Sequence, residues 1–300
     1  MDFYPKNKIR KFLLHANEHT KLLVLGDGRS GTTWLADVLN YDGRYLDFFE
    51  SYHGRRVLRL PDNRIYPTSG DFASSSANFK KYVLNSNIFA DQQAPRGFAV
   101  SGCLVKDITS HMVFSLLYQE FDYRIYIIRN PLSVASSKER YGRWHSNADL
   151  QKLIDTSPKL RLMSDCCFSR CLVKSRFHEY VLVWCLLNKI ALPQVLSNAF
   201  VVFYEDLLLN PEQSFYNLFA YIDQRCRFNK YRLRILRTVG KRSKTTSGSY
   251  LINDEATRLH GWEKYKSKTE ISLAYKIIEI FELDYLYQDN IVPQNVPKKD

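Results

Sequence analysis

The sequence predicts an α/β fold, in which a doubly wound parallel β-sheet is flanked by helices on both faces. Short apolar runs typical of buried strands alternate with amphipathic runs typical of helices along the 300 residues. Two of these strands lead through glycine or Asn-Pro directly into a helix, an arrangement typical of ligand-binding edges of parallel sheets. We expect a single domain over residues 1–300, with about 145–198 as a candidate helical cap insertion.

The expected elements follow one another in a regular alternation. Apolar and β-branched runs predict strands at 21–25, 98–105, 123–128 and 200–204. Helical periodicity predicts helices at 32–40, 77–90, 109–120, 131–142, 212–222, 228–238 and 270–282, with helical segments filling 147–196. We expect 51–72 to be irregular and basic, and 240–256 to be a loop. Ligand-binding residues should then lie at the carboxyl ends of the strands.

The most informative segment is the glycine-rich turn that follows the strand at 21–25. Gly26 and Gly31 have the spacing of the phosphate-binding loop GxxxxGK[ST], and a helix begins at Thr32. Thr32 stands where that loop has lysine, and the cation, Arg29, lies inside the turn. A nucleoside triphosphate is a poor ligand without the lysine, whereas arginine can bind two oxygens of a phosphate or sulfate.

A second strand end offers a similar set of groups. The run 123–128 ends at Arg129, and Asn130 and Pro131 are a good N-cap and first residue for the next helix. Hydroxyls, among them that of Ser137, lie in the first turns of this helix. Taken alone, this segment fits an anion site and an ordinary capped helix equally well.

Together the two segments resemble the sulfotransferases that use 3′-phosphoadenylyl sulfate (PAPS), and Gly-Arg-Ser-Gly-Thr-Thr is similar to the loop of bacterial and Golgi-type members. The resemblance implies a P-loop-type fold and sulfuryl transfer from PAPS to a hydroxyl of a carbohydrate or other small alcohol. For the 5′-phosphosulfate it implies Arg29, Ser30, Gly31, Thr32 and Thr33, and for the 3′-phosphate Arg129 and Ser137. A basic loop that often closes over the nucleotide in this family implies Arg242, Ser243 and Lys244.

Sulfuryl transfer requires positive charge at the sulfuryl group and a base for the acceptor hydroxyl. Arg29 supplies charge, and Lys106 beyond the strand at 98–105 is a second catalytic candidate. Cytosolic family members have a histidine after Lys-Thr at this strand end, whereas Asp107 and an isoleucine follow here. Bacterial and Golgi-type members use a glutamate shortly after the first helix, which implies Glu50 as the base. His53 and Asp107 stay open as alternatives.

The composition favours anionic partners. Lys and Arg number 43 against 31 Asp and Glu, a net charge of +12, and the sequence pI is about 9.3. We expect no nucleic-acid partner, because no aromatic-rich binding motif accompanies the charge. No apolar signal core occurs near the start, and the apolar run 181–192 is too short to span a bilayer, although peripheral membrane contact fits the charge.

The six cysteines form no CxxC pair and have no histidine at a metal-finger spacing, so we expect a cytoplasmic protein without a metal.

Two other functions share parts of the pattern of strands, glycine-rich turn and arginines. A P-loop nucleotide or small-molecule kinase has the same fold, but the missing lysine counts against it. A non-catalytic nucleotide- or nucleic-acid-binding protein would keep Arg29 and Arg129 and lose the base.

Overall fold

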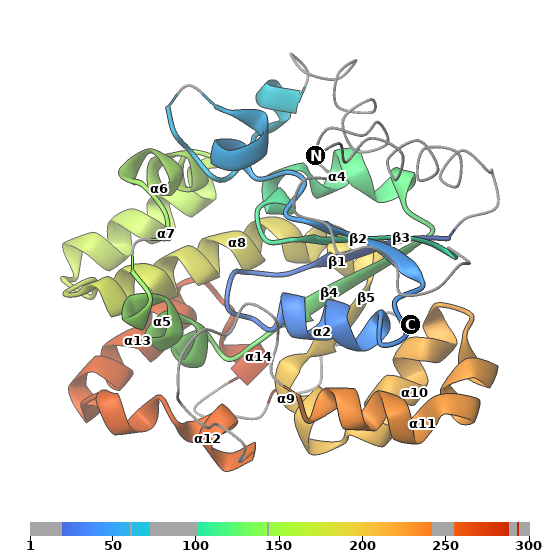
Figure 1. The fold of residues 1–300 in the computed structure, drawn as a ribbon. Coiled ribbons are helices and arrows are strands. Elements are labelled where there is room, and N and C mark those ends of the chain that lie inside the picture. Colours follow the sequence, from blue (N-terminus) through green and yellow to red (C-terminus); the bar gives the residue numbers. More distant parts are fainter. Residues whose placement is uncertain are drawn as a thin grey trace, which may run out of the picture.

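A computed structural model of the chain describes residues 20–60, 62–72, 101–142, 144–241, 255–287 and 293. Its centre is a five-stranded sheet in the order β2–β3–β1–β4–β5, and every neighbouring pair is parallel (Figure 1). The strands are β1 (Thr20–Leu25), β2 (Tyr45–Phe49), β3 (Gly102–Asp107), β4 (Tyr123–Ile128) and β5 (Phe200–Phe203). The predicted α/β class with a parallel sheet flanked by helices is confirmed.

Two layers of helices cover the sheet, because alternate residues of each strand point to opposite faces. The core on one face includes α4 (Phe114–Leu117), α5 (Pro131–Arg140) and α8 (Arg176–Asn198), with α13 (Lys268–Ile280) packed against α8. The core on the other includes α2 (Thr32–Leu39), α9 (Tyr204–Leu209) and α10 (Pro211–Tyr221), with α11 (Arg225–Val239) packed against α10 and α2. Further helices are α6 (Asn147–Ile154), α7 (Pro158–Ser169), α12 (Glu255–His260) and α14 (Asp284–Tyr287).

The segment proposed as a cap insertion, 145–198, contributes α6, α7 and α8. Of these, α8 is part of the core, since consecutive residues from Tyr180 to Leu187 are buried in it against α5 and the sheet. Among the described residues α8 is also the one helix long and apolar enough to cross a membrane, and 67% of its apolar window is buried inside the protein. A core helix passes the same test, so this finding is weak evidence for a membrane span.

Four local differences from the sequence prediction bear on the site. Strand β2 was not predicted, and β3 continues to Asp107, so that Lys106 lies inside the strand. The single helix predicted at 109–120 is wrong: a 3-10 turn, a single α-turn and a second 3-10 turn occupy it. An additional short helix, α9, follows β5 directly, while the helix predicted at 77–90 lies outside the described residues.

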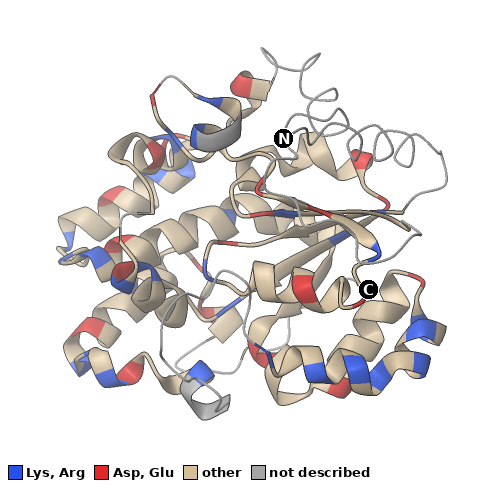
Figure 2. Ribbon diagram, in the orientation of Figure 1, with Lys and Arg blue, Asp and Glu red and all other residues tan. Residues whose placement is uncertain are grey.

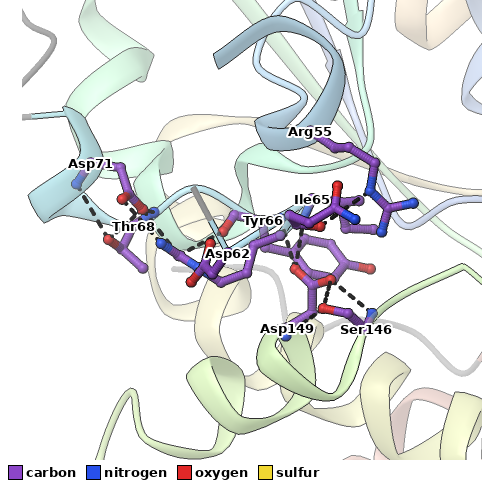
Figure 3. Close-up of polar contacts among 10 residues, drawn as sticks. Arg55, Asp62, Ile65, Tyr66, Thr68, Asp71, Ser146 and Asp149 are labelled. Carbon is purple, nitrogen blue, oxygen red and sulfur yellow. Dashed lines mark hydrogen bonds and ion pairs between the residues drawn. The ribbon is translucent and has the colours of Figure 1, made fainter. Parts of the chain in front are cut away.

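A polar junction holds the segment after β2 against α6 (Figure 3). Asp149 accepts hydrogen bonds from the backbone N–H groups of Ile65, at 2.7 Å, and Tyr66, at 3.2 Å. Its other carboxylate oxygen closes the capping box of α6 with Ser146. The same segment is closed on itself by Asp71, whose carboxylate accepts from the backbone and hydroxyl of Thr68. This part of the predicted irregular region therefore has a fixed shape.

The register places the ends of three strands beside one another. Lys106 of β3 is paired with Val24 of β1 on one side and with Phe49 of β2 on the other. Leu25, the last residue of β1, is paired with Tyr126 of β4. Because parallel strands end at the same edge of the sheet, the turns after β1, β2 and β4 all begin at this edge.

Candidate functional site

The turn after β1 has room for glycine alone at the two motif positions. A Cβ on Gly26 would lie 2.5 Å from the carbonyl oxygen of Ile127, and a Cβ on Gly31 would lie 2.6 Å from the ring of Tyr204. Gly31 also has a φ of +92°, which side chains disfavour, and it caps α2. The loop is thus pressed against β4 and α9, with the positive end of α2 directly behind it.

The guanidinium of Arg29 joins the two predicted binding motifs. Its Nε donates a hydrogen bond to Ser137 Oγ at 2.9 Å, although 108 positions separate the two residues. The guanidinium also lies 4.5 Å from the ring centre of Tyr141 and 5.9 Å from that of Trp144. Burial lowers the pKa of Arg29; Tyr141 opposes this effect, and the neighbouring arginines add to it.

Arg129 links the loop to the C-terminal part of the chain. Its Nη1 donates to the carbonyl of Arg29 and its Nη2 to that of Arg258, each at 3.0 Å. The guanidinium stacks on the Tyr204 ring, with 4.3 Å from its carbon to the ring centre. Arg129 Nε is buried and has no hydrogen-bond partner within the part of the chain that the structure describes, and the same holds for the hydroxyl of Ser30. Buried polar groups normally have partners, so both groups can still serve a ligand.

The two threonines that follow Gly31 form the start of α2. Thr32 is buried, whereas Thr33 is half-buried. The structure therefore brings Arg29, Ser30, the threonines, Arg129 and Ser137 to one edge of the sheet. The predicted basic loop of Arg242, Ser243 and Lys244 lies outside the described residues.

A buried ion pair fixes the shape of the loop. Lys138 of α5 donates to both carboxylate oxygens of Asp27, at 2.6 and 2.7 Å, and both side chains are almost fully buried. The carbonyl of Asp27 accepts from Ser30 N at 3.0 Å and so closes the turn around Arg29. Sequence reasoning did not single out this pair. An acidic residue between the motif glycines, together with a lysine one residue after Ser137, was the available signal.

Glu205, in the first turn of α9, holds the start of the second motif in place. Its carboxylate accepts from Asn130 N at 2.9 Å and from the hydroxyl of Tyr287 at 2.8 Å. Asn130 in turn caps α5 with its side chain. Burial raises the pKa of Glu205 to about 7, against the lowering effect of these hydrogen bonds and of Arg129.

Glu50 and Lys106 form a second buried ion pair at this edge. Lys106 Nζ donates to Glu50 Oε1 at 2.7 Å, and the backbone N–H of Glu50 donates to the carbonyl of Lys106. The Lys106 ammonium lies 3.8 Å from the ring centre of Phe49. Burial lowers the pKa of Lys106, while Glu50 raises it. Since β3 lies between β1 and β2, Lys106 stands between the loop carrying Arg29 and Glu50.

The other base candidates have different surroundings. The carboxylate of Asp107 accepts from Tyr52 N, and from the backbone and hydroxyl groups of Thr109 and Ser110. It is fully buried, and these bonds order the turn after β3. His53 is also buried, and its backbone N–H donates to the carbonyl of Glu50. Among the described residues, no group of three or more acidic, histidine or cysteine side chains could hold a metal ion.

The parallel sheet and the glycine-rich turn before α2 define a P-loop-like α/β protein, and Arg29 and Arg129 meet at the carboxyl edge of its sheet. The sulfotransferase domain family matches residues 19–267, and the chain belongs to this family. The match spans every strand of the sheet as well as Arg29, Glu50, Lys106 and Arg129.

Several solved structures are similar to the chain at low identity. The sulfotransferase domain from the curacin biosynthetic pathway is 16% identical, with 88% of this chain and 98% of that chain covered and a TM-score of 0.48. For the sulfotransferase domain of the Synechococcus PCC 7002 olefin synthase, the identity is 18%, the coverage 87% and 95%, and the TM-score 0.42. A mouse sulfotransferase complexed with PAP is 14% identical, with 88% and 85% covered and a TM-score of 0.45. The comparison with curated proteins gives no match.

Proposed function

We propose that the protein transfers a sulfuryl group from PAPS to a hydroxyl of a carbohydrate or other small alcohol. The observation that carries this proposal is the hydrogen bond from Arg29 to Ser137. It joins the turn that the family resemblance assigns to the 5′-phosphosulfate with the helix that the resemblance assigns to the 3′-phosphate. Membership of the sulfotransferase domain family supports the reaction class.

The residues at this edge fit a donor with phosphate at both ends. Among the described residues, the hydroxyl of Ser30 and the Nε of Arg129 have no hydrogen-bond partner, so both can serve a ligand. The start of α2 adds backbone N–H groups and the positive end of a helix dipole. Arg129 would bind the 3′-phosphate, while Arg29 and Ser30 would bind the sulfate-bearing end.

The donor, when bound, supplies an activated sulfuryl group whose leaving phosphate gains negative charge. Arg29 and Lys106 would stabilise that charge from two neighbouring turns of the same edge. Glu50 would accept the proton of the acceptor hydroxyl. Its hydrogen bond with Lys106 fixes the orientation of the carboxylate.

Calorimetry with adenosine 3′,5′-bisphosphate and adenosine 5′-monophosphate tests the nucleotide part of the proposal. The bisphosphate should bind more tightly, and Arg129→Ala should weaken its binding about 10- to 100-fold, because a charge-assisted hydrogen bond contributes about 1.5–3 kcal/mol. The exposed Arg161 provides a control, and Arg161→Ala should leave both affinities unchanged. Equal affinity of the wild-type protein for the two nucleotides would contradict the assignment.

The reaction itself is tested with labelled PAPS over a panel of sugars, glycans and simple alcohols in the presence of EDTA. We expect label transfer without added metal, and Arg29→Ala should reduce turnover more than it weakens nucleotide binding. Phosphoryl transfer from ATP that depends on added Mg²⁺ would instead identify a kinase.

A further inference from the structure

Helix α11 is strongly basic. Its 15 residues include six lysines and arginines and no acidic residue. The cations are Arg225, Arg227, Lys230, Arg232, Arg234 and Arg237, and the exposed Lys241 follows just beyond the helix. The proposed reaction uses none of these residues. Figure 2 shows α11 in the outer layer of helices, with several of its turns coloured as Lys or Arg.

The buried face of α11 is apolar and is fully used in packing. Phe228, Ile235 and Val239 are buried in the core formed with α2 and α10. The backbone of α11 is kinked at Tyr231; Lys230 is exposed just before the kink, and Arg234 and Arg237 are exposed after it, together with Leu233, which is 67% exposed. We refer to Lys230, Leu233, Arg234, Arg237 and Lys241 as the α11 surface.

Most of the charge on this helix is not neutralised. Arg227 pairs with Asp42, and Arg232 pairs with Glu212. Within the described part of the chain, no carboxylate pairs with the four cations of the α11 surface. Four exposed positive charges around an exposed leucine would repel one another in the isolated protein, and they suit a negatively charged partner.

We propose that the α11 surface docks the protein onto a membrane that contains anionic phospholipids. The charge of such a surface complements the cations, each of which gains about 1 kcal/mol near anionic headgroups. The exposure of Leu233 favours a lipid surface over a dissolved polyanion as the partner. An exposed leucine gains free energy by entering the headgroup–acyl boundary, whereas it contributes nothing to binding a hydrophilic polyanion.

The orientation of α11 relates this surface to the candidate site. Arg227, in its first turn, contacts Tyr41 just beyond the end of α2, at 3.1 Å from Nε to the hydroxyl oxygen. At its other end the carbonyl of Val239 accepts from Trp34 Nε1, in the first turn of α2, at 3.0 Å. The two helices are therefore antiparallel, and the last turn of α11 lies beside the glycine-rich turn. Docking by the α11 surface would hold the candidate site near the lipid headgroups.

Vesicle cosedimentation of the full chain tests the proposal without any measurement of activity. We expect binding to phosphatidylcholine vesicles that contain phosphatidylserine, and no binding to phosphatidylcholine alone. The variant Lys230→Gln/Arg234→Gln/Arg237→Gln should lower the partition coefficient about 100-fold, since each cation contributes about fivefold. Leu233→Ser should lower it about fivefold. Thermal melting of each variant verifies that it is folded.

A second triple variant, Lys264→Gln/Lys268→Gln/Lys276→Gln, removes the same charge from exposed positions near and on α13. It should bind anionic vesicles nearly as well as the wild-type protein, and an equal loss in both triple variants would overturn the proposal. Absence of binding to anionic vesicles would also overturn it. A third result would overturn it as well. In that result the α11 triple variant abolishes binding of dextran sulfate, and Leu233→Ser changes neither dextran sulfate binding nor vesicle binding.

Discussion

The buried pair of Asp27 and Lys138 gives the sharpest test of how the candidate site is held together. Lys138→Met removes the ammonium and leaves the Asp27 carboxylate inside the protein, where the side chains of the pair are 2% and 1% exposed. Asp27→Asn leaves the opposite defect, an unpaired buried ammonium. The double variant removes both charges and retains a side chain at each position.

The expected magnitude follows from burial. Breaking a buried ion pair from one side costs about 3–5 kcal/mol, because the remaining charge has lost its partner and cannot reach water. The double variant should lose clearly less than either single variant, so the coupling free energy should exceed the cost of either single variant and be more than about 3 kcal/mol. The bond from Ser30 N to the Asp27 carbonyl depends on the same turn, and both single variants should therefore also weaken nucleotide binding.

Urea unfolding followed by circular dichroism measures these free energies. The ion pair of Arg161 and Asp155 is a suitable control, because its 2.8 Å separation is similar while its side chains are 59% and 34% exposed. Arg161→Met should cost less than about 1 kcal/mol. Additive effects of the two single variants, each no larger than that of the control, would refute the view that the pair fixes the loop.

Three further predictions concern the site. In a kinetic assay, Glu50→Gln should lower turnover about 10²- to 10⁴-fold with little change in nucleotide affinity. Asp107→Asn should chiefly lower the melting temperature. If only Asp107→Asn abolished turnover, the base would lie on β3. Ser137→Ala removes the group that accepts the hydrogen bond from Arg29. In calorimetry it should weaken binding of adenosine 3′,5′-bisphosphate about tenfold. An unchanged affinity would count against a shared role of the two motifs. Glu205 has a pKa of about 7 in the folded protein, against an ordinary value of 4.5. As the pH rises, the folded protein therefore keeps this proton to a higher pH than the unfolded chain does. The free energy of unfolding should fall by about 3 kcal/mol between pH 4.5 and pH 7. In Glu205→Gln this part of the pH dependence should disappear from unfolding curves, and its persistence would show that another group causes it.

Short-range signals in the sequence were enough to locate the local structure of both predicted binding motifs. The strand, glycines and helix start at 21–39 are defined by neighbours in the chain, as is the N-cap by which Asn130 starts α5. The run 123–128 gave the bounds of β4 without error. Such signals depend on backbone conformations and caps that involve only a few consecutive residues.

Contacts between distant segments could not be foreseen in this way. The strand that precedes Glu50 forms because β3 offers it an edge, and its sequence alone did not predict it. The pairing of Lys106 with Glu50 and of Lys138 with Asp27 depends on which strands are neighbours and which helix covers them. The sequence does not indicate whether a carboxylate will be solvated by water or paired with an ammonium, since burial is a property of the folded chain. The sequence alone thus determined which groups stand at the strand ends, and the tertiary structure decided which of them meet.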